Sequence, residues 1–356
     1  MRETANIIVN SVACLRRNFD VLVVCGLHNK VFAEQLMLES YAVGAHPYLW
    51  VFDEKFFLKY SRKFPEDGVA ILPKHIQSLL ENSDEIIWLS QFDNLEKFPS
   101  NVRKGIVSFW DTFDEVIKAK PRLYVTLLSA RCIDGMNISY SKFLHSFANS
   151  VNVDYNKLRK IGNAVASKLN GKKLVHVYDA NGTDLTFGIY KRHVGEVGTL
   201  EDCFSIGREC EVEVPTGEVY VAPIETSANG VLMVEEFRDY GIQNLELHFK
   251  KGKIVSFKAE KGCDVFRDLL EKADGDKDRI AEFGVGTNYG MKPIGYRIYD
   301  EKALGTVHIA IGNNVHLGGV NKASIHYDFV LYSPNVEADN VLLMRKGKLS
   351  TRQFTK

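Results

Sequence analysis

The sequence has no excess of charge of either sign, because 45 lysines and arginines balance 45 aspartates and glutamates over its 356 residues. A chain without net charge cannot rely on the release of counterions for affinity, so nucleic acid is not expected as its partner. The same argument speaks against an anionic membrane surface. Long apolar runs are missing too, since stretches such as Val21 to Cys25 fall far short of the ~20 residues that a membrane-spanning helix needs.

Cysteines are few and dispersed. The six of them form no Cys-x-x-Cys pair, which argues against a structural zinc site and against a disulfide framework. The start of the sequence, Met1-Arg2-Glu3, leads into a helix-like segment instead of the apolar run of a signal peptide. These features predict a cytoplasmic protein with reduced, partly buried thiols.

Helical and strand-like patterns alternate over the first 150 residues. Apolar residues recur at helical spacing in 5–15, 30–43, 73–80 and 102–119, and apolar runs typical of strands occupy 20–25, 48–52, 85–89 and 123–128. Such alternation implies βαβ crossovers and a mostly parallel sheet. The turn after the first strand, Cys25-Gly26-Leu27-His28-Asn29, holds one glycine where a dinucleotide-binding loop needs three, so a nucleotide site is not expected.

The pattern changes beyond residue 150. A helical segment at 154–169 ends at Asn170-Gly171, and only 264–273 and 278–282 look helical after it. The strand-like runs are short and separated by glycines; they are 174–178, 185–189, 218–222, 230–234, 245–249, 253–259, 305–311 and 324–330. We therefore predict an α/β domain over residues 1–150 and a strand-rich α+β domain, dominated by antiparallel strands, over residues 151–356.

Carboxylates and histidines gather beside glycines in this second half. One glutamate heads a strand-like run, another lies beside two glycines, and the spacing in Ser324-Ile325-His326-Tyr327-Asp328 directs His326 and Asp328 to the same face of a strand. The clustered residues are Glu218, Glu282, Glu301, His308, His326 and Asp328. Several carboxylates with two imidazoles suit a pair of divalent ions such as zinc, cobalt or manganese, because carboxylates can bridge two ions and offset their charge.

Each of these residues also has a simpler interpretation. A single glutamate on a strand, such as Glu218 or Glu301, is usually a solvated charge. His308, within Thr-Val-His-Ile-Ala-Ile, could be a hydrogen-bonded histidine of the core, and a His-x-Asp sequence could be no more than a hydrogen-bonded pair. Seven other histidines lack acidic neighbours in glycine-rich turns and are assigned no site; they are His28, His46, His75, His145, His176, His193 and His248.

At these positions the sequence resembles the aminopeptidase T and aminopeptidase S family, the thermophilic-type dimetal aminopeptidases. The strings that carry the likeness follow the family's order; they are Pro-Thr-Gly-Glu-Val-Tyr-Val-Ala-Pro (215–223), Ser-Ala-Asn-Gly-Val (227–231), Ala-Glu-Phe-Gly-Val-Gly-Thr-Asn (281–288), Asp-Glu-Lys-Ala-Leu-Gly-Thr-Val-His-Ile-Ala-Ile-Gly (300–312) and Ile-His-Tyr-Asp (325–328). The likeness also reaches residues 180–187, and the first half is similar to the family's smaller α/β domain.

The resemblance implies a ligand set for two divalent metal ions. The positions that match the family's ligands are Glu218, Glu282, Glu301, His308, His326 and Asp328. Known members place a tyrosine seven residues after the first ligand histidine, whereas this sequence has Val315 there, followed by His316. His316, Tyr289 and Tyr327 are the candidates to replace that tyrosine. The resemblance also implies short peptides as substrates and a homodimer.

These observations favour a cytoplasmic metallo-aminopeptidase that removes the N-terminal residue from short peptides. Two metal ions would polarise the scissile carbonyl and activate a shared water. Glu282 is the predicted carrier of the proton from that water to the leaving amine, because the glycines beside it leave room for water and substrate. Two alternatives stay open: a non-catalytic protein that keeps the site for metal or small-molecule binding, which the missing tyrosine motivates, and a metal-dependent amidase with a non-peptide substrate.

Overall fold

The computed structural model of the protein describes residues 1–60, 63, 71–92, 98–118, 120–134, 136, 138–200 and 211–350. The chain divides into two units, Met1–Asn152 with Gly198–Thr216 and Val153–Val197 with Gly217–Lys356. The expected division at residue 150 differs from these units in one segment, since 198–216 returns to the first unit. Within the described residues, no helix is both long enough and apolar enough to cross a membrane.

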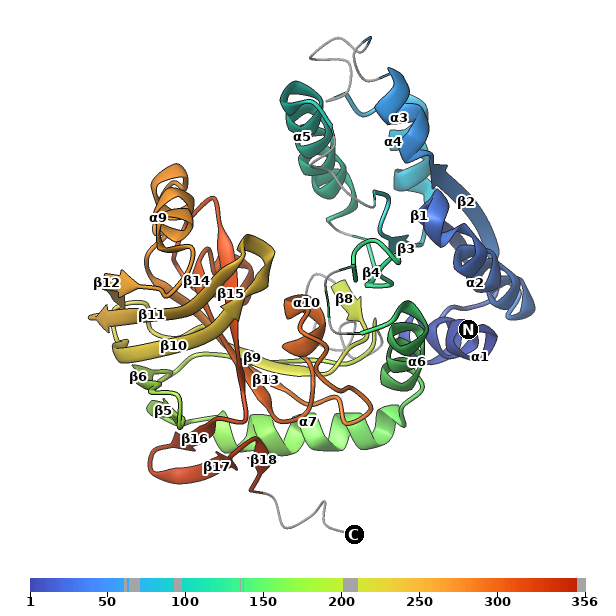
Figure 1. Cartoon of the computed structure of the whole chain (residues 1–356). Coiled ribbons are helices and arrows are strands. Elements are labelled where there is room, and N and C mark those ends of the chain that lie inside the picture. The colour runs from blue at the N-terminus through green and yellow to red at the C-terminus, as the bar shows by residue number, and fades with distance from the viewer. Residues whose placement is uncertain are drawn as a thin grey trace. The chain divides into compact units, whose positions relative to one another are not determined.

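A parallel sheet of five strands forms the centre of the first unit, as the alternating pattern predicts (Figure 1). Its strands, in spatial order, are β2 (His46–Phe52), β1 (Asp20–Gly26), β3 (Glu85–Leu89), β4 (Arg122–Val125) and β8 (Glu211–Val214). β1 and β3 are buried along nearly their whole length, which is why they read as continuous apolar runs. β8 comes from the segment expected in the second domain and joins this sheet because its buried residues Val212 and Val214 extend the apolar layer beside β4.

Helices flank the strands of the first unit. Those within its described residues are α1 (Arg2–Ile7), α2 (Lys30–Ala42), α3 (Glu54–Tyr60), α4 (Lys74–Asn82), α5 (Ser100–Ile117) and α6 (Tyr140–Val151). The segment expected as a helix at 5–15 consists of the end of α1 and a π-helical turn at Ile8–Val12. The sequence patterns did not predict α3 or α6; α6 begins after Ser139, whose hydroxyl accepts a hydrogen bond from the backbone N–H of Lys142.

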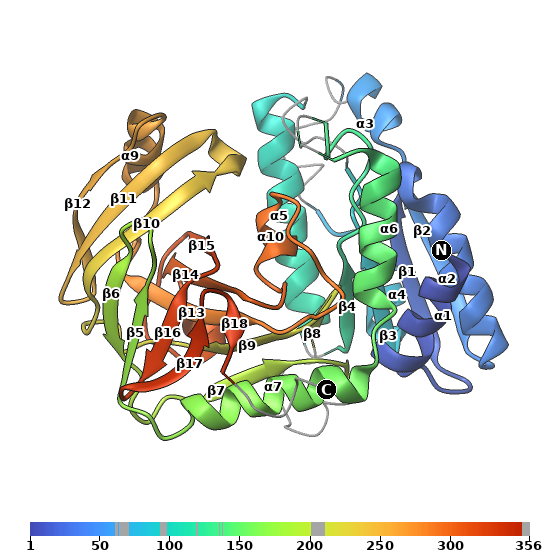
Figure 2. The same cartoon turned by 60° about the horizontal axis from the view of Figure 1, so that its bottom comes forward.

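Two antiparallel sheets build the second unit, as its short runs predict (Figures 1 and 2). The larger sheet has the order β12 (Lys253–Lys258), β11 (Ile242–Lys250), β10 (Asn229–Phe237), β6 (Asp184–Gly188), β5 (Leu174–Tyr178), β16 (Asn335–Ala338), β17 (Val341–Arg345) and β18 (Lys348–Leu349). The smaller sheet has the order β15 (His326–Tyr332), β14 (Thr306–Gly312), β13 (Ile280–Gly286), β9 (Glu218–Val221) and β7 (Val194–Val197).

The helices of the second unit, among its described residues, are α7 (Tyr155–Leu169), α9 (Cys263–Lys272) and α10 (Arg297–Asp300). α7 lies along β7 and β9 (Figure 2), and the carboxylate of Asp154 caps its first turn. The expectation of a helix at 278–282 is wrong. This segment leads into β13, because β14 pairs with it from Ile280 onward and β9 pairs with it from Phe283 onward.

The core of the second unit joins its two sheets. Phe187 of β6 meets Phe283 of β13 with 5.3 Å between the ring centroids, and both side chains are fully buried. Side chains alternate along a strand, so Phe283 and Val285 face this core whereas Glu282 and Gly284 face the other side of the sheet. β13 is buried along its whole length, so this second face is covered as well.

Candidate metal centre

Neighbouring strands of the smaller sheet carry five of the six predicted site residues on its second face. They are Glu218 on β9, Glu282 on β13, His308 on β14, and His326 with Asp328 on β15. The strand register pairs Gly284 with His308 and pairs Ala310 with both Glu282 and Asp328. These two small residues leave the space above the sheet into which the longer side chains extend.

Glu218, Glu282 and His308 form the first of two groups whose donor atoms converge. Nε2 of His308 lies 3.0 Å from Oε1 of Glu218 and 3.4 Å from Oε1 of Glu282. The exposed fractions of the side chains are 12% for Glu218, 7% for Glu282 and 2% for His308. Carboxylate oxygens and an imidazole nitrogen in this arrangement are donors that a divalent ion such as zinc accepts.

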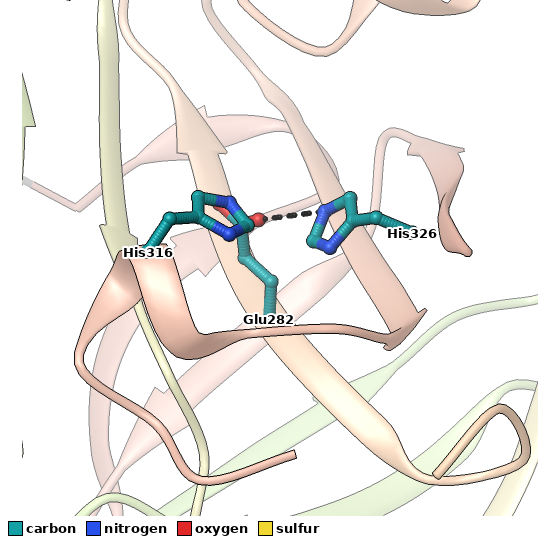
Figure 3. Close-up of side chains that lie close together, drawn as sticks. All are labelled: Glu282, His316 and His326. Carbon is teal, nitrogen blue, oxygen red and sulfur yellow. Dashed lines mark ion pairs between the residues drawn. The ribbon is translucent and has the colours of Figure 1, made fainter. Parts of the chain in front are cut away.

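Glu282 also belongs to the second group, with His316 and His326 (Figure 3). Its Oε2 lies 3.1 Å from Nε2 of His326, and a nitrogen of His316 completes a set of donor atoms within 4.8 Å of one another. His316 comes from the short 3₁₀ turn η6 (Val315–Leu317) and is exposed. The two groups therefore share Glu282, which directs one oxygen toward His308 and the other toward His326.

A backbone contact sets the orientation of His326. Its Nδ1 donates a hydrogen bond of 2.6 Å to the carbonyl oxygen of Asn313. The other ring nitrogen, Nε2, therefore faces Glu282 and Asp328 at 3.1 and 3.0 Å. A histidine that binds metal is commonly held by such a bond to its second nitrogen, which fixes both the tautomer and the ring direction.

The close approach of acids and imidazoles shifts their ionisation. Burial by itself would lower the pKa of both histidines, but Asp328 and Glu282 raise the pKa of His326 to about 11, and Glu218 and Glu282 raise the pKa of His308 well above its usual value. Burial would raise the pKa of Glu282, but hydrogen bonds from the two histidines lower it to about 2. Without metal the imidazoles are therefore protonated at neutral pH, and an incoming ion must displace their protons.

Asp328 is held from two sides. Its Oδ1 lies 3.0 Å from Nε2 of His326, and its Oδ2 accepts a hydrogen bond of 2.7 Å from Nη1 of Arg297. Arg297 also contacts Asp239 at 3.2 Å through Nε. The patterns in the sequence did not predict a role for Arg297. The available signal was its position four residues before Glu301, a spacing that brings side chains together on one side of a helical turn.

Glu301 directly follows α10 and is buried. Its Oε1 accepts a hydrogen bond of 2.7 Å from Nζ of Lys302, and its Oε2 lies 3.9 Å from Nη1 of Arg297. Among the described residues, neither convergent group includes Glu301. Both of these contacts are with cations, and the assignment of Glu301 as a metal ligand stays a prediction.

The three candidates to replace the family's tyrosine lie in different places. The hydroxyl of Tyr289 accepts a hydrogen bond of 2.7 Å from the backbone N–H of Asp154. Tyr327 points to the face of β15 opposite His326, where its hydroxyl lies 3.5 Å from that of Tyr240. His316 is the candidate whose side chain enters a convergent group.

Gly284 leaves the space that the first group occupies. A Cβ atom at this position would lie 2.0 Å from Cε1 and 2.2 Å from Nε2 of His308, and 2.8 Å from Oε1 of Glu218. Any side chain would therefore collide with two of the donors. Glycine here and the mixture of carboxylates and imidazoles around it fit a bound divalent ion.

The part of the chain that carries these side chains matches a known protein family. The sequence model of the thermophilic metalloprotease (M29) family matches residues 149–349. Aminopeptidase AmpS of Bacillus subtilis (strain 168) is 29% identical over 187 residues, which cover 46% of this chain and 44% of AmpS. Aminopeptidase T of Thermus aquaticus is 27% identical over 199 residues, which cover 48% of each chain. The matched part thus spans about half the length of these curated relatives.

Solved structures show a likeness over nearly the whole chain. AmpT from Thermus thermophilus superposes with a TM-score of 0.78 at 19% sequence identity, covering 98% of both chains. The 2,5-dihydroxypyridine dioxygenase from Pseudomonas putida KT2440 superposes with a TM-score of 0.68 at 14% identity, covering 99% of this chain and 97% of the dioxygenase. At these identities the two likenesses establish the fold alone.

Proposed function

Because the chain belongs to the thermophilic metalloprotease (M29) family, we propose that it is a metal-dependent aminopeptidase that uses two divalent ions. The observation that carries this proposal is the position of Glu282 between two imidazoles, with Oε1 3.4 Å from Nε2 of His308 and Oε2 3.1 Å from Nε2 of His326. A carboxylate that directs one oxygen to each side can bridge two ions and offset their charge. The proposed ions are zinc, cobalt or manganese.

The side chains divide between two ion positions. Glu218, Glu282 and His308 would hold one ion, and Glu282, His326 and Asp328 the other. When bound, the ions would polarise the scissile carbonyl and lower the pKa of a water, so that it could act as the nucleophile near neutral pH. Glu282 is the proposed acceptor of the proton of that water, which it would pass to the leaving amine.

The proposed substrates are short peptides, which lose their N-terminal residue. Relatives named aminopeptidases support this choice. We further propose that the protein is a homodimer in the cytoplasm, as expected from the sequence. The same water chemistry would serve a metal-dependent amidase, and Val315 in place of the tyrosine keeps a non-catalytic binding protein as a second candidate. A panel of amino-acid amides, dipeptides and non-peptide amides separates these three functions.

The test of the overall proposal is hydrolysis of that panel before and after chelation, with metal analysis of the same samples. We expect release of N-terminal residues, its loss after chelation, and its return when Zn²⁺, Co²⁺ or Mn²⁺ is added back. Cleavage of non-peptide amides alone would favour the amidase. A protein fully loaded with metal that cleaves nothing in the panel would favour the binding protein.

Glu282→Gln tests the mechanism. The substitution keeps the size of the side chain but removes its basic carboxylate, so kcat for an amino-acid amide should fall by ~10²-fold or more at equal metal occupancy, with a smaller change in KM. Tyr327→Phe, on the opposite face of β15, is the control and should leave both constants unchanged. Equal rates for Glu282→Gln and wild type at equal occupancy would remove Glu282 from proton transfer.

A further inference from the structure

Buried polar residues fix the loop 313–321. This loop carries His316, which lies close to Glu282 and His326 (Figure 3). Nδ2 of Asn314 donates a hydrogen bond of 3.2 Å to Oε1 of Glu225, and Oδ1 of Asn314 accepts one of 2.8 Å from the backbone N–H of Asn321. All three of these polar side chains are almost completely buried. Buried polar groups that satisfy one another specify a single arrangement, so this loop is rigid although its tip is exposed.

The same loop is tied to the backbone just before Glu282. Nδ2 of Asn314 donates to the carbonyl oxygen of Ala281 at 3.1 Å, and Nδ2 of Asn321 donates to that of Ile280 at 2.9 Å. The pairing of β13 with β14 shifts by one residue between Ile280 and Glu282. A bulge of this kind redirects the side chain beside it and leaves backbone groups for other partners. One hydrogen-bond network thus positions Glu282 and the loop together.

His316 faces the same point as Glu282 and His326. One donor atom from each of the three lies within 4.8 Å of the other two, and the two imidazole rings are 5.3 Å apart at their centroids with 70° between their planes. We infer that His316 is a ligand of the second ion, in addition to the proposed ligands Glu282, His326 and Asp328. The inference rests on the proposed two-ion function and adds one nitrogen to the ligands that the sequence identifies.

This nitrogen makes the two ion positions chemically different. The first position has two carboxylates and one imidazole, from Glu218, Glu282 and His308. With His316, the second position would have two imidazoles beside the carboxylates of Glu282 and Asp328. Imidazole suits zinc, and carboxylate-rich sites suit manganese. The second position therefore selects Zn²⁺ over Mn²⁺ more strongly than the first does.

Metal titration of the metal-free, full-length protein tests this inference. His316→Ala should lower the affinity for the second Zn²⁺ by at least ~10-fold and change the visible absorption of the Co²⁺-loaded protein, because one nitrogen ligand is lost. Binding of Mn²⁺ at the first position should not change. Val315→Ala is the matched control, since this neighbour lies on the same turn and its side chain is also exposed, and it should titrate like wild type.

An added ligand separates a direct role of His316 from a role in shaping the loop. His316→Gly opens the position to solvent, so free imidazole should restore the Co²⁺ absorption of wild type. Wild-type Zn²⁺ affinity with an unchanged Co²⁺ spectrum in His316→Ala would overturn the inference, as would a loss that imidazole does not restore. Because no step measures hydrolysis, a protein that binds Zn²⁺ through His316 but cleaves no peptide would refute the proposed function alone.

Discussion

One methyl group added at position 284 should dismantle the first ion position without altering any ligand. The Cβ of Gly284→Ala would lie 2.0 Å from Cε1 of His308, whereas carbon atoms in contact are about 3.5–4.0 Å apart. The imidazole would have to move by roughly 1.5 Å, the difference between these distances. β14, which carries His308, is buried along its whole length, so that movement meets packed neighbours. Overpacking of this kind typically lowers the free energy of unfolding by about 1–3 kcal/mol.

The assay for Gly284→Ala combines metal titration with thermal unfolding of the metal-free protein. We expect the affinity at the first ion position to fall by at least ~10-fold, since His308 and Glu218 are both displaced. Gly188→Ala on β6 is the matched control, because its Cβ would lie 3.2 Å from the tip of Ile224 and 3.4 Å from Cβ of Ser227, so metal binding should be retained. Wild-type metal affinity in Gly284→Ala would refute the idea that Glu218 and His308 hold an ion above this glycine.

Three further predictions concern pH. Glu85 is fully buried with no hydrogen-bond partner among the described residues, and burial raises its pKa well above the ordinary 4.5, so the folded state keeps it neutral while the unfolded chain ionises. Glu85→Gln should therefore stabilise the protein by roughly 1–3 kcal/mol at pH 7 and by almost nothing below pH 4.5. If the variant and wild type had the same unfolding curve at pH 7 as well as below pH 4.5, this prediction would be contradicted. Metal loading should release about two protons at neutral pH, from His308 and His326, so the affinity for metal should rise with pH. The enthalpy of metal binding measured by calorimetry should therefore differ between two buffers of different ionisation enthalpy. The raised pKa of His326 stabilises the metal-free fold fully below pH 6.5, and this stabilisation should fade as the pH rises toward 11.

Patterns local to the sequence were enough to predict the two kinds of sheet. The apolar runs of β1 and β3 indicate strands that are buried on both faces, and the short runs after residue 173 indicate antiparallel pairing. Short sequence motifs also identified Glu218, His308 and the His326–Asp328 pair as candidates, because the glycines and the alternating side chains around them lie within a few residues along the chain. These features depend on neighbours along the chain, which a sequence displays directly.

Other features depended on partners far away in the sequence. Residues 278–282 resemble a helix locally, yet β9 and β14 draw the segment into a sheet through pairings such as Phe283 with Val221 and Ile280 with Ile311. β8 joins the first unit for the same reason, since its partner β4 lies about ninety residues earlier, as in the pairing of Arg122 with Glu211. Strand propensity is weak compared with such tertiary pairing.

The side chains that complete the site were likewise fixed by the tertiary structure alone. Arg297 reaches Asp328 across 31 residues, and Asn314 reaches Ala281 across 33, so no local spacing reveals either contact. The sequence by itself determined which residues carry carboxylates and imidazoles. Which of them face one another followed from the register of β13, β14 and β15 and from the loop tied beside Glu282, because a shift of one residue would turn every side chain of a strand to the opposite face.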